Sequence, residues 1–139
     1  MAAATSIMRA QQIVLARVDE ALRPLGLTFA RYEALVLLTF SRRGSLPLGK
    51  MGERLMIHPT SVTNIVDRLE ARGLARRVDH PSDRRTTLCE ITDEGVALVE
   101  EATAAVTAVG LGIVGLSDRE VEQLTRLVAK LRRESGDFA

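Results

Sequence analysis

Residues 59–92, PTSVTNIVDRLEARGLARRVDHPSDRRTTLCEIT, decide the fold of this chain. From Thr60 onward, apolar residues recur three or four positions apart, the spacing of one helix face, and Gly73 supplies a stop signal. Two short strand-like stretches follow, at residues 74–79 and 86–91, on either side of the turn-rich HPSDRR. The segment therefore predicts a helix followed by a β-hairpin. The apolar residues of the helix are Val62, Ile65, Val66 and Leu69.

The charge of the chain is unevenly distributed. Residues 42–85 hold ten Lys and Arg against five Asp and Glu, whereas the rest of the chain holds nine against thirteen. The formal net charge of +1 conceals this asymmetry. A basic segment within an acidic chain is typical of a protein that binds a polyanion, so the charge pattern favours nucleic acid as the partner.

The composition indicates one mainly α domain. The chain has 139 residues, 46% of them hydrophobic but only 3% aromatic, so Ala, Val and Leu must form most of the core. It contains no long apolar run and no signal-peptide pattern, so we expect a soluble, cytoplasmic protein without membrane segments. One cysteine and two histidines exclude an intramolecular disulfide and provide no metal-ligand spacing. We therefore expect no metal and no cofactor.

Helices are predicted on both sides of this segment from helical spacing and cap residues. Thr28 and Thr92 are the expected N-caps of two of them, and Ser117 with Glu120 forms a capping box for a third. Residues 41–45 are predicted to be a loop. The expected order is four helices, a small β-hairpin wing and two more helices. The helices are expected at residues 5–22, 29–40, 48–56, from Thr60 to Gly73, from Thr92 to the glycines near 110, and after Ser117.

The helix that starts near Thr60 has a polar face opposite its apolar stripe. Thr60, Thr63 and Asn64 are short polar residues that suit the major groove, where hydroxyl and amide groups can bond base edges. Ser61 and Arg68 lie at the flank of this face, where phosphate contact is easier. The alternative is that these residues only cap the helix start.

Four arginines lie on the predicted hairpin, at its base and at its tip. A helix followed at once by a basic hairpin is the arrangement of a winged helix-turn-helix, in which arginine enters the minor groove or contacts phosphate. A solvated charged surface is the alternative for the arginines alone. They are Arg76, Arg77, Arg84 and Arg85.

Three segments resemble the MarR-type transcriptional regulators: LTFARYEALVLL (27–38), TSVTNIVDRLEARGLARR (60–77) and DRRTTLCEITDEG (83–95). The resemblance covers nearly the whole chain. It implies a winged-helix homodimer on double-stranded DNA with a pseudo-palindromic operator, usually as a repressor. It also implies a DNA-binding lobe at residues 28–92 and dimerisation helices at residues 1–25 and 93–139.

Carried onto this sequence, the wing signature falls on Asp83 and Arg85. Arg85 is then the expected minor-groove residue, Asp83 the carboxylate that braces the arginines, and Arg84 a phosphate contact. The recognition-helix pattern falls on Thr60, Ser61, Thr63, Asn64 and Arg68. Asn64 stands where relatives often have Arg, which leaves the base preference open.

Residues near these two motifs receive secondary roles. Asp67 is expected to pair with a nearby cation. Lys50, Arg54, Arg76 and Arg77 are expected phosphate contacts, with solvated side chains as the alternative.

One short helix and a wing read few base pairs, so specificity requires two copies separated by about one helical turn, roughly 34 Å. The apolar stripes of the first helix and the last two helices provide a dimer surface, although in a monomer they can also pack on one another. No phosphate-binding loop or catalytic pair supports an enzyme. The other alternative, a winged-helix module without DNA binding, is disfavoured by the charge of the central segment.

The family resemblance also implies control by a small molecule, often phenolic or anionic, between the DNA-binding lobe and the dimer helices. Conceivable polar groups for such a pocket are Arg9, Arg17, Arg31, Tyr32 and His58, and the last of these is expected to end the short helix before it. Control by oxidation is the alternative. Cys89, the only thiol, is expected to face inward and to be inert.

Overall fold

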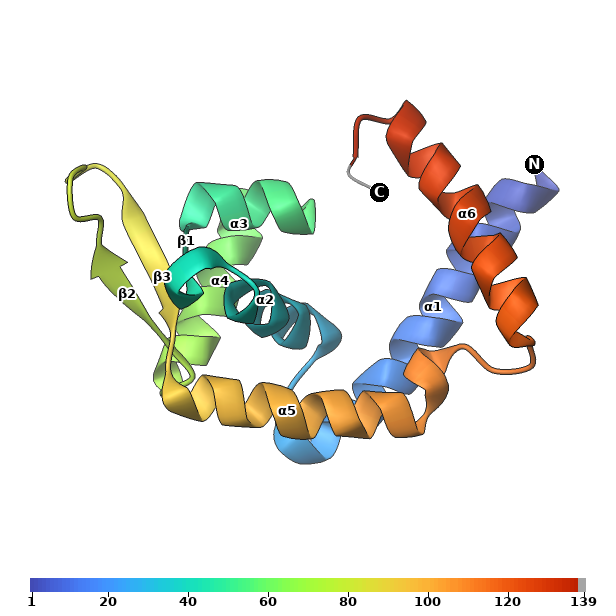
Figure 1. Cartoon of the computed structure of the whole chain (residues 1–139), viewed down its shortest axis with the longest axis horizontal. Coiled ribbons are helices and arrows are strands. Elements are labelled where there is room, and N and C mark those ends of the chain that lie inside the picture. Colours follow the sequence, from blue (N-terminus) through green and yellow to red (C-terminus); the bar gives the residue numbers. More distant parts are fainter. Residues whose placement is uncertain (138–139) are drawn as a thin grey trace.

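The computed structural model describes residues 1–137, which form helices α1 to α6 and one small sheet (Figure 1). The mainly α fold and the predicted order of its helices are confirmed. Residues 138 and 139, the end of the predicted dimerisation segment 93–139, lie outside the described residues. The helices are α1 (Ala2–Leu22), α2 (Phe29–Thr39), α3 (Leu48–Leu55), α4 (Pro59–Ala71), α5 (Asp93–Ala108) and α6 (Asp118–Glu134). The strands are β1 (Ser45–Pro47), β2 (Ala75–Asp79) and β3 (Thr87–Ile91), and the 3-10 turns are η1 (Arg23–Leu25), η2 (Arg42–Gly44) and η3 (Gly110–Gly112).

The long helix α5 connects two groups of elements. Near its first residues, α2, α3, α4 and the sheet gather into one lobe, and α1 and α6 lie towards its other end (Figure 1). α5 packs against both α2 and α1. The lobe that contains α4 and the wing is therefore fixed directly to the helices predicted to form a dimer.

The sheet contains one strand more than predicted. β3 pairs antiparallel with β2 and also with β1, so the strand order is β1-β3-β2, and Leu46 lies opposite Cys89. The prediction of a loop at residues 41–45 is therefore wrong at Ser45. Three residues that end at Pro47 carry no alternating pattern, and only their pairing with β3 makes them a strand. The proline is tolerated because β1 lies at the edge of the sheet.

The core is centred on α2. Tyr32, Ala34, Leu35 and Leu38 are buried on this helix. The predicted stripe of α4 packs into the same core, since Val62, Ile65, Val66 and Leu69 are all buried. Burial of this stripe leaves the opposite, polar face of α4 to solvent.

The predicted N-caps are confirmed. Thr28 Oγ1 accepts a hydrogen bond from the Arg31 amide at 3.4 Å, and Thr92 Oγ1 accepts one from the Gly95 amide at 3.1 Å. Glu120 Oε2 accepts the Ser117 amide at 2.8 Å. Each bond satisfies an amide that a helix start leaves without a partner.

The start of α4 differs from the prediction. α4 begins at Pro59, and His58 caps this helix instead of ending the preceding one. His58 Nδ1 accepts a hydrogen bond from the Thr60 amide at 3.1 Å. Pro59 suits the first helical position, where no amide hydrogen is needed.

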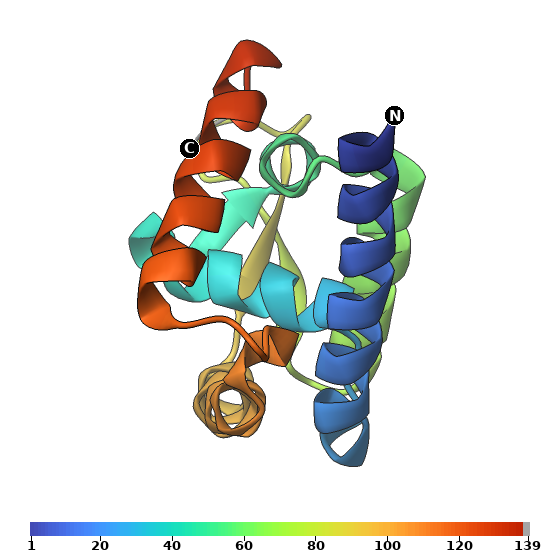
Figure 2. The same ribbon diagram turned by 90° about the vertical axis from the view of Figure 1, so that its right-hand side faces the viewer.

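Apolar side chains on α1 and α6 remain exposed. No described residue of α6 is buried, and Leu124, Leu127 and Leu131 are 42%, 61% and 55% exposed. Ile7 and Ile13 are exposed on α1, and α1 and α6 stand apart in Figure 2. In the described part of the chain, α1 and α6 therefore do not cover one another, whereas α1 packs against α5 as the monomer alternative expected. Within residues 1–137, no helix combines the length and apolarity that crossing a membrane requires.

Candidate nucleic-acid interface

The exposed face of α4 carries all five residues predicted for the recognition helix. Thr60, Ser61, Thr63, Asn64 and Arg68 are exposed, and the buried stripe lies on the opposite side. Thr63 Oγ1 donates to the Pro59 carbonyl at 3.2 Å. Because its hydrogen is used within the helix, the Thr63 hydroxyl presents only acceptor capacity and a methyl group to a base edge.

The tip of the wing is held in shape by Asp83. Its Oδ1 accepts the Arg85 amide at 3.0 Å, and its Oδ2 accepts the Thr86 hydroxyl at 2.7 Å. The hydrogen bonds from the Thr86 hydroxyl and the Arg85 amide lower the pKa of Asp83 below its ordinary value, so this carboxylate remains ionised. Asp83 was expected to brace the arginines, but it braces the backbone at Arg85 and not the guanidinium groups. Arg84 and Arg85 are exposed beside it.

His80 also stabilises the wing loop. Its backbone amide donates to the Thr86 carbonyl at 3.3 Å, and its Nδ1 accepts the Ser82 amide at 3.2 Å. Because Nδ1 accepts, the neutral ring carries its hydrogen on Nε2, which is left as a donor. His80 is the first residue of the turn-rich HPSDRR, and that pattern alone gives no sign of this role.

Arg77 is bound to carboxylates of α4. Its Nη2 lies 2.5 Å from Asp67 Oδ1 and its Nη1 lies 2.9 Å from Glu70 Oε1, while its amide donates to Glu70 Oε2 at 2.8 Å. The backbone and side-chain hydrogen bonds from Arg77 lower the pKa of Glu70. The prediction that Asp67 pairs with a cation is confirmed. The network links α4 to β2, so it fixes the position of the wing relative to α4.

Arg76 is also paired within the sheet. Its Nε donates to Glu90 Oε1 at 2.9 Å, and its Nη2 forms an ion pair with the same oxygen. The phosphate contacts predicted for Arg76 and Arg77 stay predictions, and the structure provides both with an internal partner. The four wing arginines thus divide into Arg76 and Arg77 at the base, which have carboxylate partners although Arg76 is 64% exposed, and Arg84 and Arg85 at the exposed tip.

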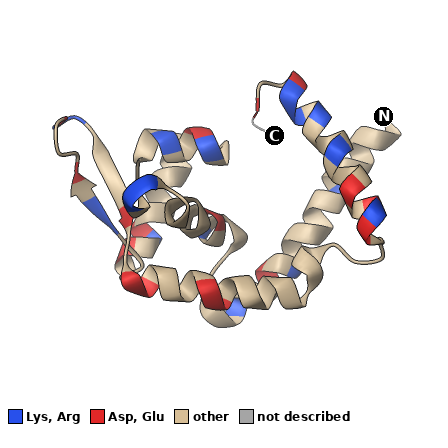
Figure 3. Ribbon diagram, in the orientation of Figure 1, with Lys and Arg blue, Asp and Glu red and all other residues tan. Residues whose placement is uncertain are grey.

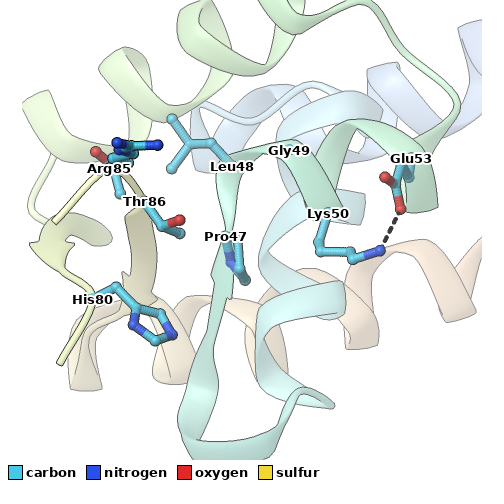
Figure 4. Close-up of a pocket in the computed structure, with 9 residues that line it drawn as sticks. Pro47, Leu48, Gly49, Lys50, Glu53, His80, Arg85 and Thr86 are labelled. Carbon is cyan, nitrogen blue, oxygen red and sulfur yellow. Dashed lines mark hydrogen bonds and ion pairs between the residues drawn. The ribbon is translucent and has the colours of Figure 1, made fainter. Parts of the chain in front are cut away.

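A cleft lies between the wing and the first turns of α3 (Figure 4). It has a volume of about 570 Å³, and it is lined by Arg85 and His80 of the wing on one side and by Lys50 of α3 on the other. Lys50 Nζ forms an ion pair with Glu53 at 2.8 Å, with both side chains mostly exposed. Such an exposed pair is weak, so the lysine remains available to a stronger anion. Arg54, the other predicted phosphate contact on α3, is exposed as well.

Basic residues mark the ribbon at η2, α3 and the wing, and acidic residues mark the first turn of α5 (Figure 3). Arg42 and Arg43 of η2 are exposed, and in the sequence they stand out only through their contribution to the basic segment 42–85. Among residues 1–137, no group of His, Cys, Asp and Glu side chains is arranged to hold a metal ion.

Cys89 is fully buried on β3. Burial raises the pKa of its thiol to about 11, so the reactive thiolate is scarce at neutral pH. The prediction that Cys89 faces inward is confirmed, and its inertness stays a prediction.

The polar groups suggested for an effector pocket do not converge. Tyr32 Oη is hydrogen-bonded to Thr103 Oγ1 at 2.9 Å, Arg17 donates to the Gly112 carbonyl at 3.1 Å, and His58 caps α4. An apolar cavity of about 320 Å³ lies instead beside α1. It is lined by Gln11, Val14, Leu15, Val18, Phe29 and Leu111.

Comparisons with known proteins agree with this geometry. The sequence profile of the MarR family matches residues 30–87. The structure is similar to that of Sco5413, a MarR family transcriptional regulator from Streptomyces coelicolor, with 53% identity and a TM-score of 0.93 over 99% of this chain and 96% of that one. Sco3205, a MarR family transcriptional regulator from the same organism crystallised in complex with DNA, is 27% identical with a TM-score of 0.84, over 94% of this chain and 83% of that one. The HTH-type transcriptional repressor MdtR from Bacillus subtilis (strain 168) is 33% identical over 81% of this chain and 72% of its own length.

Proposed function

Because this chain belongs to the MarR family and is therefore a DNA-binding transcriptional regulator and not an enzyme, we propose that it represses transcription as a homodimer. The dimer occupies a pseudo-palindromic operator, one half-site for each protomer. MdtR, a 33% identical relative, is a repressor, which supports this direction of control. Binding to DNA places the protein in the cytoplasm.

The observation that carries the proposal is the exposed polar face of α4 beside a rigid wing with exposed arginines. α4 enters the major groove, where Thr60, Thr63 and Asn64 contact base edges. Arg68 and Ser61 bond phosphates at the groove edge. The similarity to Sco3205, which was crystallised with DNA, supports this docking.

The wing follows the DNA into the adjacent minor groove. Arg85 enters that groove, where negative potential is concentrated, and Arg84 contacts phosphate. Asp83 fixes the loop that carries both residues, through its bonds to the Arg85 amide and the Thr86 hydroxyl. Lys50 and Arg54 bind the backbone strand that passes over α3. Residues 28–92 thus form the DNA-binding lobe.

We propose that residues 1–25 and 93–139 form the dimer interface. The exposed apolar side chains lie on α1, on α6 and on the connection between α5 and α6. An apolar surface of this extent is typical of a protein–protein interface, and a second copy of the chain presents the same stripes in return. Members of this surface are Ile7, Ile13, Ile113, Val114, Leu116, Leu124, Leu127 and Leu131.

A charge on this surface tests the dimer directly. Leu127→Glu places a carboxylate within the stripe of α6, and the variant is expected to sediment as a monomer and to lose operator binding. Arg126→Glu is the matched control, since residue 126 lies on the opposite side of α6 and the variant is expected to remain dimeric. Dimeric Leu127→Glu protein would contradict this interface.

Release from the operator is proposed to follow binding of a small phenolic or anionic molecule whose apolar part enters the cavity beside α1. The cavity wall is apolar except for Gln11, and it joins α1 to Phe29 of the lobe. A ligand in this cavity shifts the conformational equilibrium of the dimer only if it binds the conformation that releases DNA more tightly than the DNA-bound conformation.

Selection of genomic fragments with the purified protein tests the function. Bound fragments are expected to share two inverted half-sites, and the binding is expected to weaken steeply with salt. A screen of small aromatic acids and phenols for release of the selected fragment then tests the effector. Recovery of random fragments with no common half-site would contradict sequence-specific regulation.

A further inference from the structure

The C-terminal end of α4 is bound directly to the junction between α1 and α2. Arg72 follows the last residue of α4, and its Nη1 donates to the Gly26 carbonyl at 2.9 Å. Its Nη2 donates to the Leu25 carbonyl at 3.0 Å. Since one planar guanidinium holds two consecutive carbonyls, the contact fixes direction as well as distance.

Gly26 allows this approach because it has no side chain. A Cβ at Gly26 would lie 3.1 Å from Arg72 Nη1, and the residue has a φ of +67°, in the left-handed region. Arg31, in the first turn of α2, donates to the same carbonyl at 3.4 Å. We call the set Leu25, Gly26, Arg31 and Arg72 the Gly26 joint. It joins the η1 turn after α1, the first turn of α2 and the end of α4.

The two residues that follow Arg72, Gly73 and Leu74, are bound to the start of α5. Thr92, the N-cap of α5, donates through Oγ1 to the Gly73 carbonyl at 2.6 Å and through its amide to the Leu74 carbonyl at 3.1 Å. A Cβ at Gly95 would lie 2.2 Å from the Leu74 carbonyl oxygen, so the first turn of α5 rests directly on this segment. The end of α4 is therefore held between the turn that follows α1 and the start of α5, and α1 and α5 both belong to the proposed dimer interface.

We propose that Arg72 is a specificity-determining residue that sets the separation of the two half-sites. The proposal rests on the proposed dimeric function. Elsewhere α4 packs on α2, α3 and β2, which belong to its own lobe. The Gly26 joint adds a direct hydrogen-bonded link from the C-terminal end of α4 to the η1 turn that follows α1, so it fixes the orientation of each α4 relative to the dimer.

The length of α4 makes this orientation decisive. Its 13 residues span roughly 20 Å at about 1.5 Å per residue. A tilt of about 10° around Arg72 would therefore displace Thr60 by roughly 3.4 Å, which is about the rise of one base pair. A small change in the tilt of α4 at the Gly26 joint thus displaces the N-terminal end of α4 by about one base-pair step.

The test measures binding to duplexes in which the two selected half-sites are separated by the natural distance, by one base pair less and by one base pair more. Arg72→Ala is expected to remain dimeric and to lose about tenfold of the discrimination among these duplexes, because two charge-assisted hydrogen bonds are removed. Arg72→Lys keeps the charge without the planar fork, so it is expected to be intermediate. Arg23→Ala, which removes the same charge from η1, is expected to discriminate like the wild type.

Unchanged discrimination by a folded, dimeric Arg72→Ala protein would overturn the role of Arg72. If that variant does not fold, full wild-type discrimination by Arg72→Lys overturns it equally. Wild-type protein that binds one half-site as tightly as two would contradict the dimeric function itself, and the inference would fall with it.

Discussion

Removal of Arg84 is predicted to reduce the salt dependence of DNA binding, whereas removal of Arg76 is predicted to leave it unchanged. Both are wing arginines. Arg84 is exposed at the tip, and no ion pair to it is found among residues 1–137. Arg76 is bound to Glu90 through Nε at 2.9 Å and through Nη2. Only an arginine that neutralises a phosphate releases the counterion that phosphate had bound.

The magnitude follows from the number of phosphates. Arg84 occurs twice in a dimer, and each phosphate contact contributes about 0.9 to the slope of log affinity against log salt, so Arg84→Ala should flatten that slope by about 1.8. Between about 50 and about 200 mM salt, wild-type affinity should therefore fall about tenfold further than the affinity of the variant.

The assay is fluorescence anisotropy with a labelled operator duplex at four salt concentrations. Arg84→Ala is compared with the double variant Arg76→Gln, Glu90→Gln, which removes a paired arginine and preserves the net charge. Parallel lines for Arg84→Ala and the wild type would refute phosphate contact by Arg84. A flatter line for the double variant would show that Arg76 leaves Glu90 and binds DNA.

Three further predictions follow from local geometry. Gly95→Ala should destabilise the fold by about 3 kcal/mol in urea denaturation, since its Cβ would lie 2.2 Å from the Leu74 carbonyl oxygen. Gly49→Ala, with no atom within 4 Å of the new Cβ, should stabilise the protein by about 0.5–1 kcal/mol, and similar stabilities for the two variants would contradict this packing. Because burial raises the pKa of Cys89 to about 11, its thiol should remain protonated at pH 8, so alkylation should be far slower in the native protein than in urea; equal rates would show an accessible thiolate. Asn64→Ala should broaden the sequences recovered from a random duplex pool without changing the salt slope, and an equal loss of affinity on random DNA would point to a phosphate contact instead.

Much of the fold was predictable because helices and their starts leave local signals. The stripe of Val62, Ile65, Val66 and Leu69 has the period of a helix, and all four residues are buried. Thr28 and Thr92 cap the helices that follow them. β1 was not predictable, since three residues ending in Pro47 become a strand only by pairing with β3.

The candidate site was predicted in part. The exposed polar face of α4 was located from helical spacing, because residues on one side of a helix follow from their number. The brace formed by Asp83 was assigned to the wrong partner, because sequence does not distinguish a guanidinium from a backbone amide two residues away. The polar residues suggested for an effector pocket do not lie around one cavity. Their sequence positions follow no common helical or strand spacing that would have placed them together.

The sequence by itself determined which segment presents the reading helix and the wing, because periodicity and capping act over a few residues. Only the tertiary structure decided which arginines are left for a partner. Arg77 meets Asp67 across 10 positions, Arg76 meets Glu90 across 14, and Arg72 meets Gly26 across 46. Ion pairs and hydrogen bonds depend on distance in space, and the core of α2 and α4 sets those distances. Four arginines that look alike in the sequence therefore divide into two that have carboxylate partners at the base of the wing and two that lie exposed at its tip.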